Sequence, residues 1–234
     1  MMPRLLLASA LAVFLLATLG CTSGRGFVAD SSQFSFHRDP SIESVRRIVV
    51  MPMHRASGVG KTAVAVDLAI PAAWRELGTF EVINATMAER DLLIPDDAFR
   101  TRRISAEQLR QVYADFRADA VLLGRIEHLD SFDPVSLSLE IAMISCLDGR
   151  VLWSASGNFD GARQAIQKDI EAWFHKAGGR DNASVSGWRS ALQSPRVFAR
   201  YVADRLAVST LNPEIIEAAE TKPATGTKGG TKGN

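Results

Sequence analysis

Cys21 is the residue whose setting predicts a chemical modification. It follows an apolar run, Leu5 to Gly20, and a single positive charge at Arg4 precedes that run. A basic start, an apolar stretch of moderate length and small residues before a cut make a secretory signal. The Gly20-Cys21 pair predicts cleavage before Cys21 and acylation of its thiol. Two or three acyl chains, at about 0.8 kcal/mol per buried CH₂, would hold the protein on a membrane.

The residues around Cys21 refine this prediction. Thr18-Leu19-Gly20-Cys21 resembles a bacterial lipobox, with Leu one place later than the usual pattern. The alternative is an uncleaved anchor, for which the run is slightly short, since a spanning helix needs about 20 residues. An Asp directly after the lipidated Cys would resemble a signal for retention at the inner membrane. Thr22 occupies that position instead, so we expect delivery to the outer membrane. Residues 1–20 are then a signal peptide, and residues 21–44 a lipidated Cys with a flexible tether.

Gly58-Val59-Gly60-Lys61-Thr62 lies between an expected strand and an expected helix, where a phosphate-binding loop would be found. The full motif is GxxxxGK[ST], and Arg55 occupies the position of its first Gly. The signal would direct the protein to the periplasm, and that compartment lacks ATP. We therefore interpret this segment as a glycine-rich turn.

The remaining reactive side chains form no motif for catalysis or metal binding. The four histidines, His37, His54, His128 and His175, are scattered, and neither HExxH nor a GxSxG or SxxK nucleophile motif occurs. The chain has two carboxylate pairs, Asp96-Asp97 and Asp115/Asp119, and such pairs are also ordinary on a solvent-exposed surface. The tryptophans, Trp74, Trp153, Trp173 and Trp188, are expected in the core and at its rim rather than as a sugar-stacking platform. We predict no catalytic residue, no metal and no cofactor.

Charge and cysteine content narrow the class of partner. The chain has 27 Lys and Arg against 26 Asp and Glu, and removal of Arg4 with the signal leaves 26 of each. This balance argues against nucleic acid as the main partner. With Cys21 acylated, Cys146 is the one remaining thiol, and its apolar, alternating surroundings predict a small core residue.

Residues 45–211 are expected to form a single periplasmic domain, followed by a disordered tail, 212–234, with almost nothing to bury. A capping box at Ser105-Ala106-Glu107-Gln108 and the cap Ser194-Pro195 mark two helix starts. Asp148-Gly149 predicts a two-residue hairpin turn in which Gly accepts a positive φ. The expected elements in the first half are a strand at 46–53, a helix at 62–77 kinked or broken at Pro71 and ended by Gly78, a strand at 80–83, a surface loop at 91–103 and a helix from 106. The second half is expected to have strands at 118–130, 136–143 and 151–159, then helices at 162–177 and 195–208, with a loop at 178–182 between them.

The fold class that follows is an α/β (α+β) sandwich. Its mixed sheet has a βαβα start followed by an antiparallel three-strand meander, with helices packed on the sheet.

Four segments in this order carry a resemblance to a known group of proteins: Ile48-Val49-Val50-Met51-Pro52, Leu77-Gly78-Thr79-Phe80-Glu81-Val82-Ile83, Ala118-Asp119-Ala120-Val121-Leu122-Leu123-Gly124 and Leu147-Asp148-Gly149-Arg150-Val151-Leu152-Trp153-Ser154. The series resembles the periplasmic lipoprotein superfamily that includes the curli secretion channel lipoprotein, the TolB amino-terminal domain, FlgO-type flagellar lipoproteins and LpoB-type activators of penicillin-binding proteins. The resemblance covers about residues 46–159. It implies a non-enzymatic domain that binds other envelope proteins, often as an oligomer.

Two departures limit what this resemblance implies. Asp130 to Pro134 is too short for the inserted hairpins from which the curli channel builds its pore. The expected tether is about 23 residues, with an end-to-end distance of roughly 25–30 Å, whereas the activator lipoproteins have a long Pro-rich tether. We therefore expect an outer-membrane lipoprotein that is an assembly or accessory factor in secretion, a surface appendage or cell-wall synthesis. Its partners would be an envelope protein near that membrane, the lipid bilayer through Cys21, and a second copy of the chain. The alternative is a lipoprotein that binds a small molecule or glycan in a groove lined by tryptophans.

Overall fold

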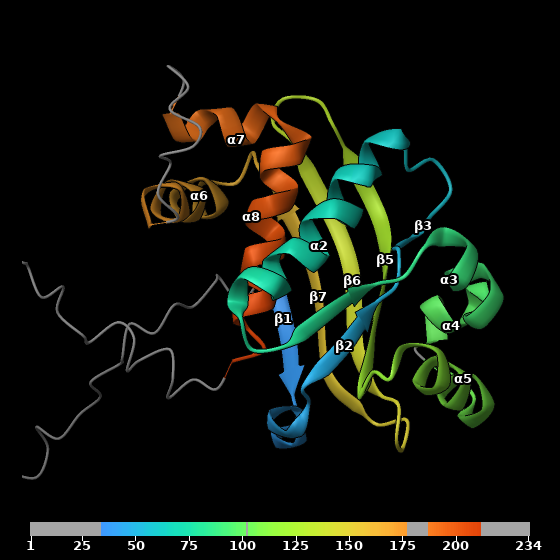
Figure 1. Cartoon of the computed structure of the whole chain (residues 1–234). Coiled ribbons are helices and arrows are strands. Elements are labelled where there is room, and N and C mark those ends of the chain that lie inside the picture. The colour runs from blue at the N-terminus through green and yellow to red at the C-terminus, as the bar shows by residue number, and fades with distance from the viewer. Residues whose placement is uncertain (1–33, 102, 177–186, 212–234) are drawn as a thin grey trace, which may run out of the picture. The chain divides into compact units, whose positions relative to one another are not determined.

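The computed structural model describes residues 34–101, 103–176 and 187–211 (Figure 1). All of them belong to one compact unit, Ala29–Asn212; the other unit, Met1–Val28 with Pro213–Asn234, lies outside the described residues. The strands are β1 (Phe34–Arg38), β2 (Arg47–Val50), β3 (His54–Arg55), β4 (Glu81–Asn84), β5 (Ala120–Asp130), β6 (Ser136–Ser145) and β7 (Val151–Asp160). The helices are η1 (Pro40–Ser44), η2 (Lys61–Ala63), α2 (Val64–Leu77), α3 (Met87–Leu93), α4 (Asp96–Thr101), α5 (Ala106–Phe116), α6 (Gln164–Lys176), η3 (Gly187–Arg189), α7 (Ser190–Gln193) and α8 (Pro195–Val208).

The strands form one mixed sheet in the order β1-β7-β6-β5-β2-β4, and β3 pairs with the far part of β5. The pairs of β2 with β4, β2 with β5 and β3 with β5 are parallel, whereas β5, β6, β7 and β1 are joined in antiparallel fashion. The predicted fold class is therefore confirmed, with the βαβα start in the parallel part and the meander in the antiparallel part.

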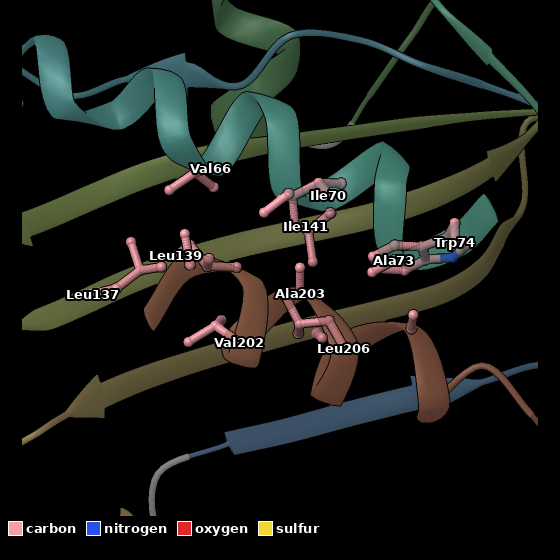
Figure 2. Packing of buried hydrophobic residues seen from close by; sticks show 14 of the residues in the cluster. Val66, Ile70, Ala73, Trp74, Leu137, Leu139, Ile141, Val202, Ala203 and Leu206 are labelled. Atoms are coloured by element: carbon pink, nitrogen blue, oxygen red, sulfur yellow. The ribbon is translucent and has the colours of Figure 1, made fainter. Parts of the chain in front are cut away.

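The larger core lies between one face of the sheet and helices α2, α6 and α8. Figure 2 shows α2 and α8 placing side chains over β6, with Val66, Ile70 and Trp74 coming from α2. This is the apolar stripe that the helical spacing predicts. The helix is not broken at Pro71, and it ends as predicted at Gly78, which has a φ of 72°. A glycine adopts this left-handed conformation without the steric penalty of a side chain.

The smaller core lies on the opposite face, where α3, α4 and α5 cover β2 and parts of β5 and β6. The prediction of a surface loop at 91–103 is wrong, because α3 and α4 occupy most of it. A capping box between Thr86 and Glu89 starts α3, with each side chain accepting the other residue's backbone N–H. Ile94 and Phe99 are 1% and 2% exposed, so this polar stretch contributes two large side chains to the core.

Residues 34–44, predicted as the end of the tether, belong to the folded unit. Strand β1 pairs with β7 along its whole length and forms one edge of the sheet. Helix η1 follows, with Asp39 accepting the Ser41 N–H at its start and Ile42 buried. The sequence between Cys21 and the first described residue is therefore 12 residues, 22–33, instead of 23.

The β6–β7 connection is a hairpin, as predicted, but its loop is longer than two residues. Residues 146–150 separate the strands, and Gly149 has the expected positive φ, 73°. The Gly149 N–H donates to the Ser145 carbonyl oxygen at 3.0 Å, which closes the turn.

Helix α6 is attached to α8 by polar contacts as well as by packing. The Asp169 carboxylate accepts hydrogen bonds from the Tyr201 hydroxyl at 2.6 Å and the Arg205 Nε at 2.9 Å. The Trp173 Nε1 donates to the Asp204 carboxylate at 2.8 Å. Both helices lie where the sequence predicts them, and the expected loop at 178–182 lies outside the described residues.

Candidate functional site

Cys21, the predicted lipidation site, lies outside the described residues and stays a prediction. The other thiol, Cys146, is 6% exposed in the smaller core, which confirms its predicted role there. Burial, with a smaller contribution from the charge of Asp119, raises the pKa of Cys146 to about 12. The thiol is therefore protonated at neutral pH and is a poor nucleophile, because the thiolate is the reactive form.

The glycine-rich segment before α2 forms a turn. Gly58 has a φ of 89°, and Lys61 to Ala63 form the short helix η2 with an exposed Lys61. Arg55, at the place of the first motif glycine, binds Asp67 at 2.6 Å. The Thr62 hydroxyl lies 2.9 Å from the Ser131 hydroxyl, so it joins this turn to the β5–β6 loop.

The histidines lie at separate places, but two of them face serines across neighbouring strands. His37 is opposite Ser154, and His128 is opposite Ser138. The sequence did not predict either pair, because strand β1 was not predicted and the register between the strands could not be derived from the sequence. The Ser138 hydroxyl is bonded to Asn158 Oδ1 at 2.9 Å and so is not positioned by a histidine base. In the described part of the chain, no group of three or more His, Cys, Asp and Glu could hold a metal ion.

The tryptophans lie in the core and at its rim, as predicted. Trp74 and Trp153 are 0% exposed and pack edge to face with centroids 5.5 Å apart, and Trp173 is buried beneath α8. Trp188 is half-buried under the Arg189 guanidinium, whose central carbon lies 4.9 Å from its ring. A glycan groove lined by tryptophans, the alternative that the sequence leaves open, would need these rings at a surface.

Polar side chains cover one half of a sheet face, which we call the polar face. It consists of three rows of side chains, and within each row the residues lie opposite one another on neighbouring strands. The side chains are half-buried or exposed, except for the two apolar residues that end the first row. The rows are His37, Ser154, Ala142 and Leu123; Ser35, Ser156, Glu140 and Arg125; and Asn158, Ser138 and His128. Ala142 and Leu123 belong to the smaller core, so the first row marks where α3 to α5 end their cover. Within the described residues, neither apolar core includes a member of the other two rows.

Local sequence produces this face through period-two alternation. In β6 and β7 the polar positions alternate with buried apolar positions, and in β6 Ser138 and Glu140 alternate with Leu137, Leu139 and Ile141. An antiparallel sheet can be solvated on one face while the other carries the core. The alternation in β6 was visible in the sequence, whereas the contribution of β1 was not.

Charged groups lie at the β5 side of the polar face. Arg125 Nη1 is paired with Glu127 Oε1 at 2.9 Å, and Glu140 lies opposite Arg125 in the register. Arg125 Nε is buried and has no hydrogen-bond partner within the described residues. His54 is the next residue in this row, on β3, and it stacks on Phe99 at 5.5 Å and contacts Asp96 at 3.3 Å. The second row therefore ends against α4.

The chemistry of the polar face suits binding better than catalysis. Short serine side chains lose little rotamer freedom when they are covered, and each hydroxyl can both donate and accept a hydrogen bond. The four neighbouring strands offer a continuous surface to a broad partner. The charges near Arg125 can set the partner's orientation, since electrostatic complementarity fixes register.

No helix among the described residues is long and apolar enough to cross a membrane. No protein-family model and no curated protein matches the chain. Among solved structures, the chain is similar to the PelC dodecamer from Paraburkholderia phytofirmans, with 15% identity over 77% of this chain and 94% of that one at a TM-score of 0.43. It is also similar to the lipoprotein GNA1162 from Neisseria meningitidis, with 17% identity over 57% of this chain and 99% of that one at a TM-score of 0.39. LpoB from E. coli matches with 12% identity over 50% of this chain and 61% of that one at a TM-score of 0.34.

The sequence resemblance predicted neighbours of this kind, and LpoB itself is among them. Identities of 12–17% and TM-scores of 0.34–0.43 transfer neither a partner nor an assembly from these proteins to this chain.

Proposed function

We propose that the protein is an outer-membrane lipoprotein whose periplasmic domain binds another envelope protein through the polar face. In this proposal the protein is an accessory factor of an envelope machine and carries out no reaction of its own. The observation that carries it is the polar face, a surface of hydroxyl and charged groups on four strands. The anchor is supported by the Gly20-Cys21 pair at the end of an apolar run.

Strand β1 connects the proposed anchor to the proposed binding surface. It is the first described element after Cys21, and its residues Ser35 and His37 begin two rows of the polar face. The connecting segment of 12 residues can reach at most about 40 Å when fully extended. As a flexible chain it would span roughly 20 Å. The partner in this proposal is therefore a protein at or near the same membrane.

A bulky charge placed on the polar face tests the proposal. Ser156 lies in the middle of the second row, between Ser35 and Glu140. Ser156→Arg should keep the fold, because this side chain is directed away from the core, but its bulk and charge should stop a partner from approaching this face. Ser44→Arg is the matched control, since Ser44 is an exposed serine at the end of η1.

The assay is in-cell cross-linking of full-length protein, followed by purification from membranes and identification of the attached protein. We expect one discrete envelope protein with the wild type and with Ser44→Arg, and its loss with Ser156→Arg. Equal cross-linking in all three would reject the polar face as the binding surface. Palmitate labelling, which Cys21→Ser should abolish, tests the anchor separately.

A further inference from the structure

An exposed aromatic side chain lies at one end of the sheet. Phe132, in the loop between β5 and β6, is 82% exposed. The loop that presents it is held in place on three sides. Asp130 Oδ1 accepts the Phe132 N–H at 3.0 Å, the Ser131 hydroxyl is bonded to Thr62 before α2, and Asp133 accepts from Gln193 of α7 at 3.2 Å.

Two further apolar side chains are exposed on the helix that begins beside this loop. Val64 and Leu68 are 47% and 67% exposed, and they are four residues apart on α2, so they lie on the same side of the helix. Thr62, which is bonded to the loop, precedes Val64 by two residues, and Lys61 beside it is exposed. Single exposed apolar residues are common on protein surfaces. Here a fixed loop with an exposed Phe lies beside a helix with two exposed apolar residues, and such a group is typical of a contact surface.

The chain from Cys21 enters the fold toward this same end. β7 runs toward the β5–β6 loop, because its last residue, Asp160, is opposite Ser136, the first residue of β6. β1 is antiparallel to β7 and starts at Phe34 opposite Gly157, three residues from that end. Figure 1 shows the start of α2 and the β5–β6 loop at one end of the sheet and the β6–β7 turn at the other.

We infer that the end of the domain formed by Phe132, Val64 and Leu68 rests on the lipid bilayer that holds the acylated Cys21. This inference depends on the proposed function, because it requires the lipid anchor. The 12-residue segment keeps the domain within about 40 Å of its anchor. The bilayer that holds the anchor is therefore an apolar surface that the domain can contact. The surface near Phe132 has one cation, Lys61, and two carboxylates, Asp130 and Asp133. The contact therefore depends on apolar insertion, and it does not require anionic lipid.

Site-specific fluorescence can test this contact. The full-length lipidated protein with Phe132→Cys is labelled with an environment-sensitive thiol dye and reconstituted in phosphatidylcholine vesicles that contain a nitroxide-labelled lipid. Cys146 should not react, since it is buried and its pKa is raised to about 12. Leu147→Cys is the matched control, because Leu147 is 93% exposed at the β6–β7 turn, at the opposite end of the sheet.

The inference predicts a blue shift and strong quenching by the nitroxide lipid at position 132, and neither at position 147. Equal quenching at both positions, or none at 132, would overturn it. A blue shift at 132 that rises with protein concentration in detergent alone would assign the surface to a second copy of the chain and would also overturn it. Palmitate labelling of the same samples separates the two proposals, because unlabelled protein refutes the anchor, whereas labelled protein without quenching refutes only the bilayer contact.

Discussion

Gly124 is the position where a single methyl group should report most clearly on the packing of the sheet. It lies in β5 opposite Ile141 of β6. A Cβ atom added there would be 2.5 Å from Met53 Cε, 2.7 Å from the Glu140 carbonyl oxygen and 3.1 Å from Ile141 Cβ. Met53 can move its flexible end, but the Glu140 oxygen belongs to the backbone of the neighbouring strand.

The size of the effect follows from these distances. Ordinary contacts begin at 3.4 Å, so a Cβ at 2.7 Å requires β5 and β6 to separate locally by about 0.7 Å. Overpacking of this kind costs about 1–3 kcal/mol. For a domain of this size each kcal/mol corresponds to about 2–4 °C in melting temperature, so Gly124→Ala should melt roughly 2–12 °C below the wild type.

The assay is thermal unfolding of the full-length protein in detergent, followed by circular dichroism. Gly60→Ala is the matched control, because its added Cβ would meet only Thr62 Oγ1, at 3.8 Å, and the φ of Gly60 is −74°. We expect the control to melt with the wild type or slightly above it, since alanine also restricts the unfolded chain. A Gly124→Ala protein that melts at the wild-type temperature would show that β5 and β6 do not approach closely at this position.

Three further changes test other parts of the structure. Burial raises the pKa of Asp204, so its charge destabilises the folded protein near neutral pH, and this effect disappears as the pH falls through the folded pKa to below the unfolded value of 3.8. Asp204→Asn retains an acceptor for Trp173 Nε1 and should melt at or above the wild type at pH 7, with the difference shrinking toward about pH 4; a lower melting temperature at pH 7 would contradict this. Gly149→Val places a β-branched residue at a φ of 73°, with its Cβ 3.3 Å from Leu109 Cδ1, and should lower stability by roughly 1–3 kcal/mol in urea unfolding. Lys61→Ala should leave the melting temperature unchanged, and Mg-ATP should stabilise neither protein; a Mg-ATP effect that this change removes would restore the phosphate-loop interpretation.

Helix ends and alternating strands could be predicted because their signals are local. The Ser194 hydroxyl accepts the Val197 N–H, Pro195 begins α8, and the helix ends at Val208 as predicted. The Ser105 and Gln108 capping box is formed as predicted at the start of α5. These signals depend on hydrogen bonds within four residues, so they do not require knowledge of the fold.

The missed elements depend on contacts that are distant in the sequence. Residues 91–103 are polar on average, but Phe99 is covered by Arg90 and His54, which come from other elements. Strand β1 is five residues long and pairs with residues more than 110 positions later. Its second half is polar because His37 is exposed and Arg38, opposite Trp153, donates to the Thr210 carbonyl oxygen. Composition alone could not separate such a strand from a tether.

The two proposals together determine which way the polar face is directed. The strands run from the end that bears Phe132 to the end that bears Leu147. If the Phe132 end rests on the bilayer, the strands extend away from the membrane and the polar face is directed sideways, parallel to the membrane plane. A partner on that face would then stand beside the protein on the same membrane. This arrangement favours a neighbouring outer-membrane component or a second copy of the chain, and it argues against a partner that approaches from the inner membrane.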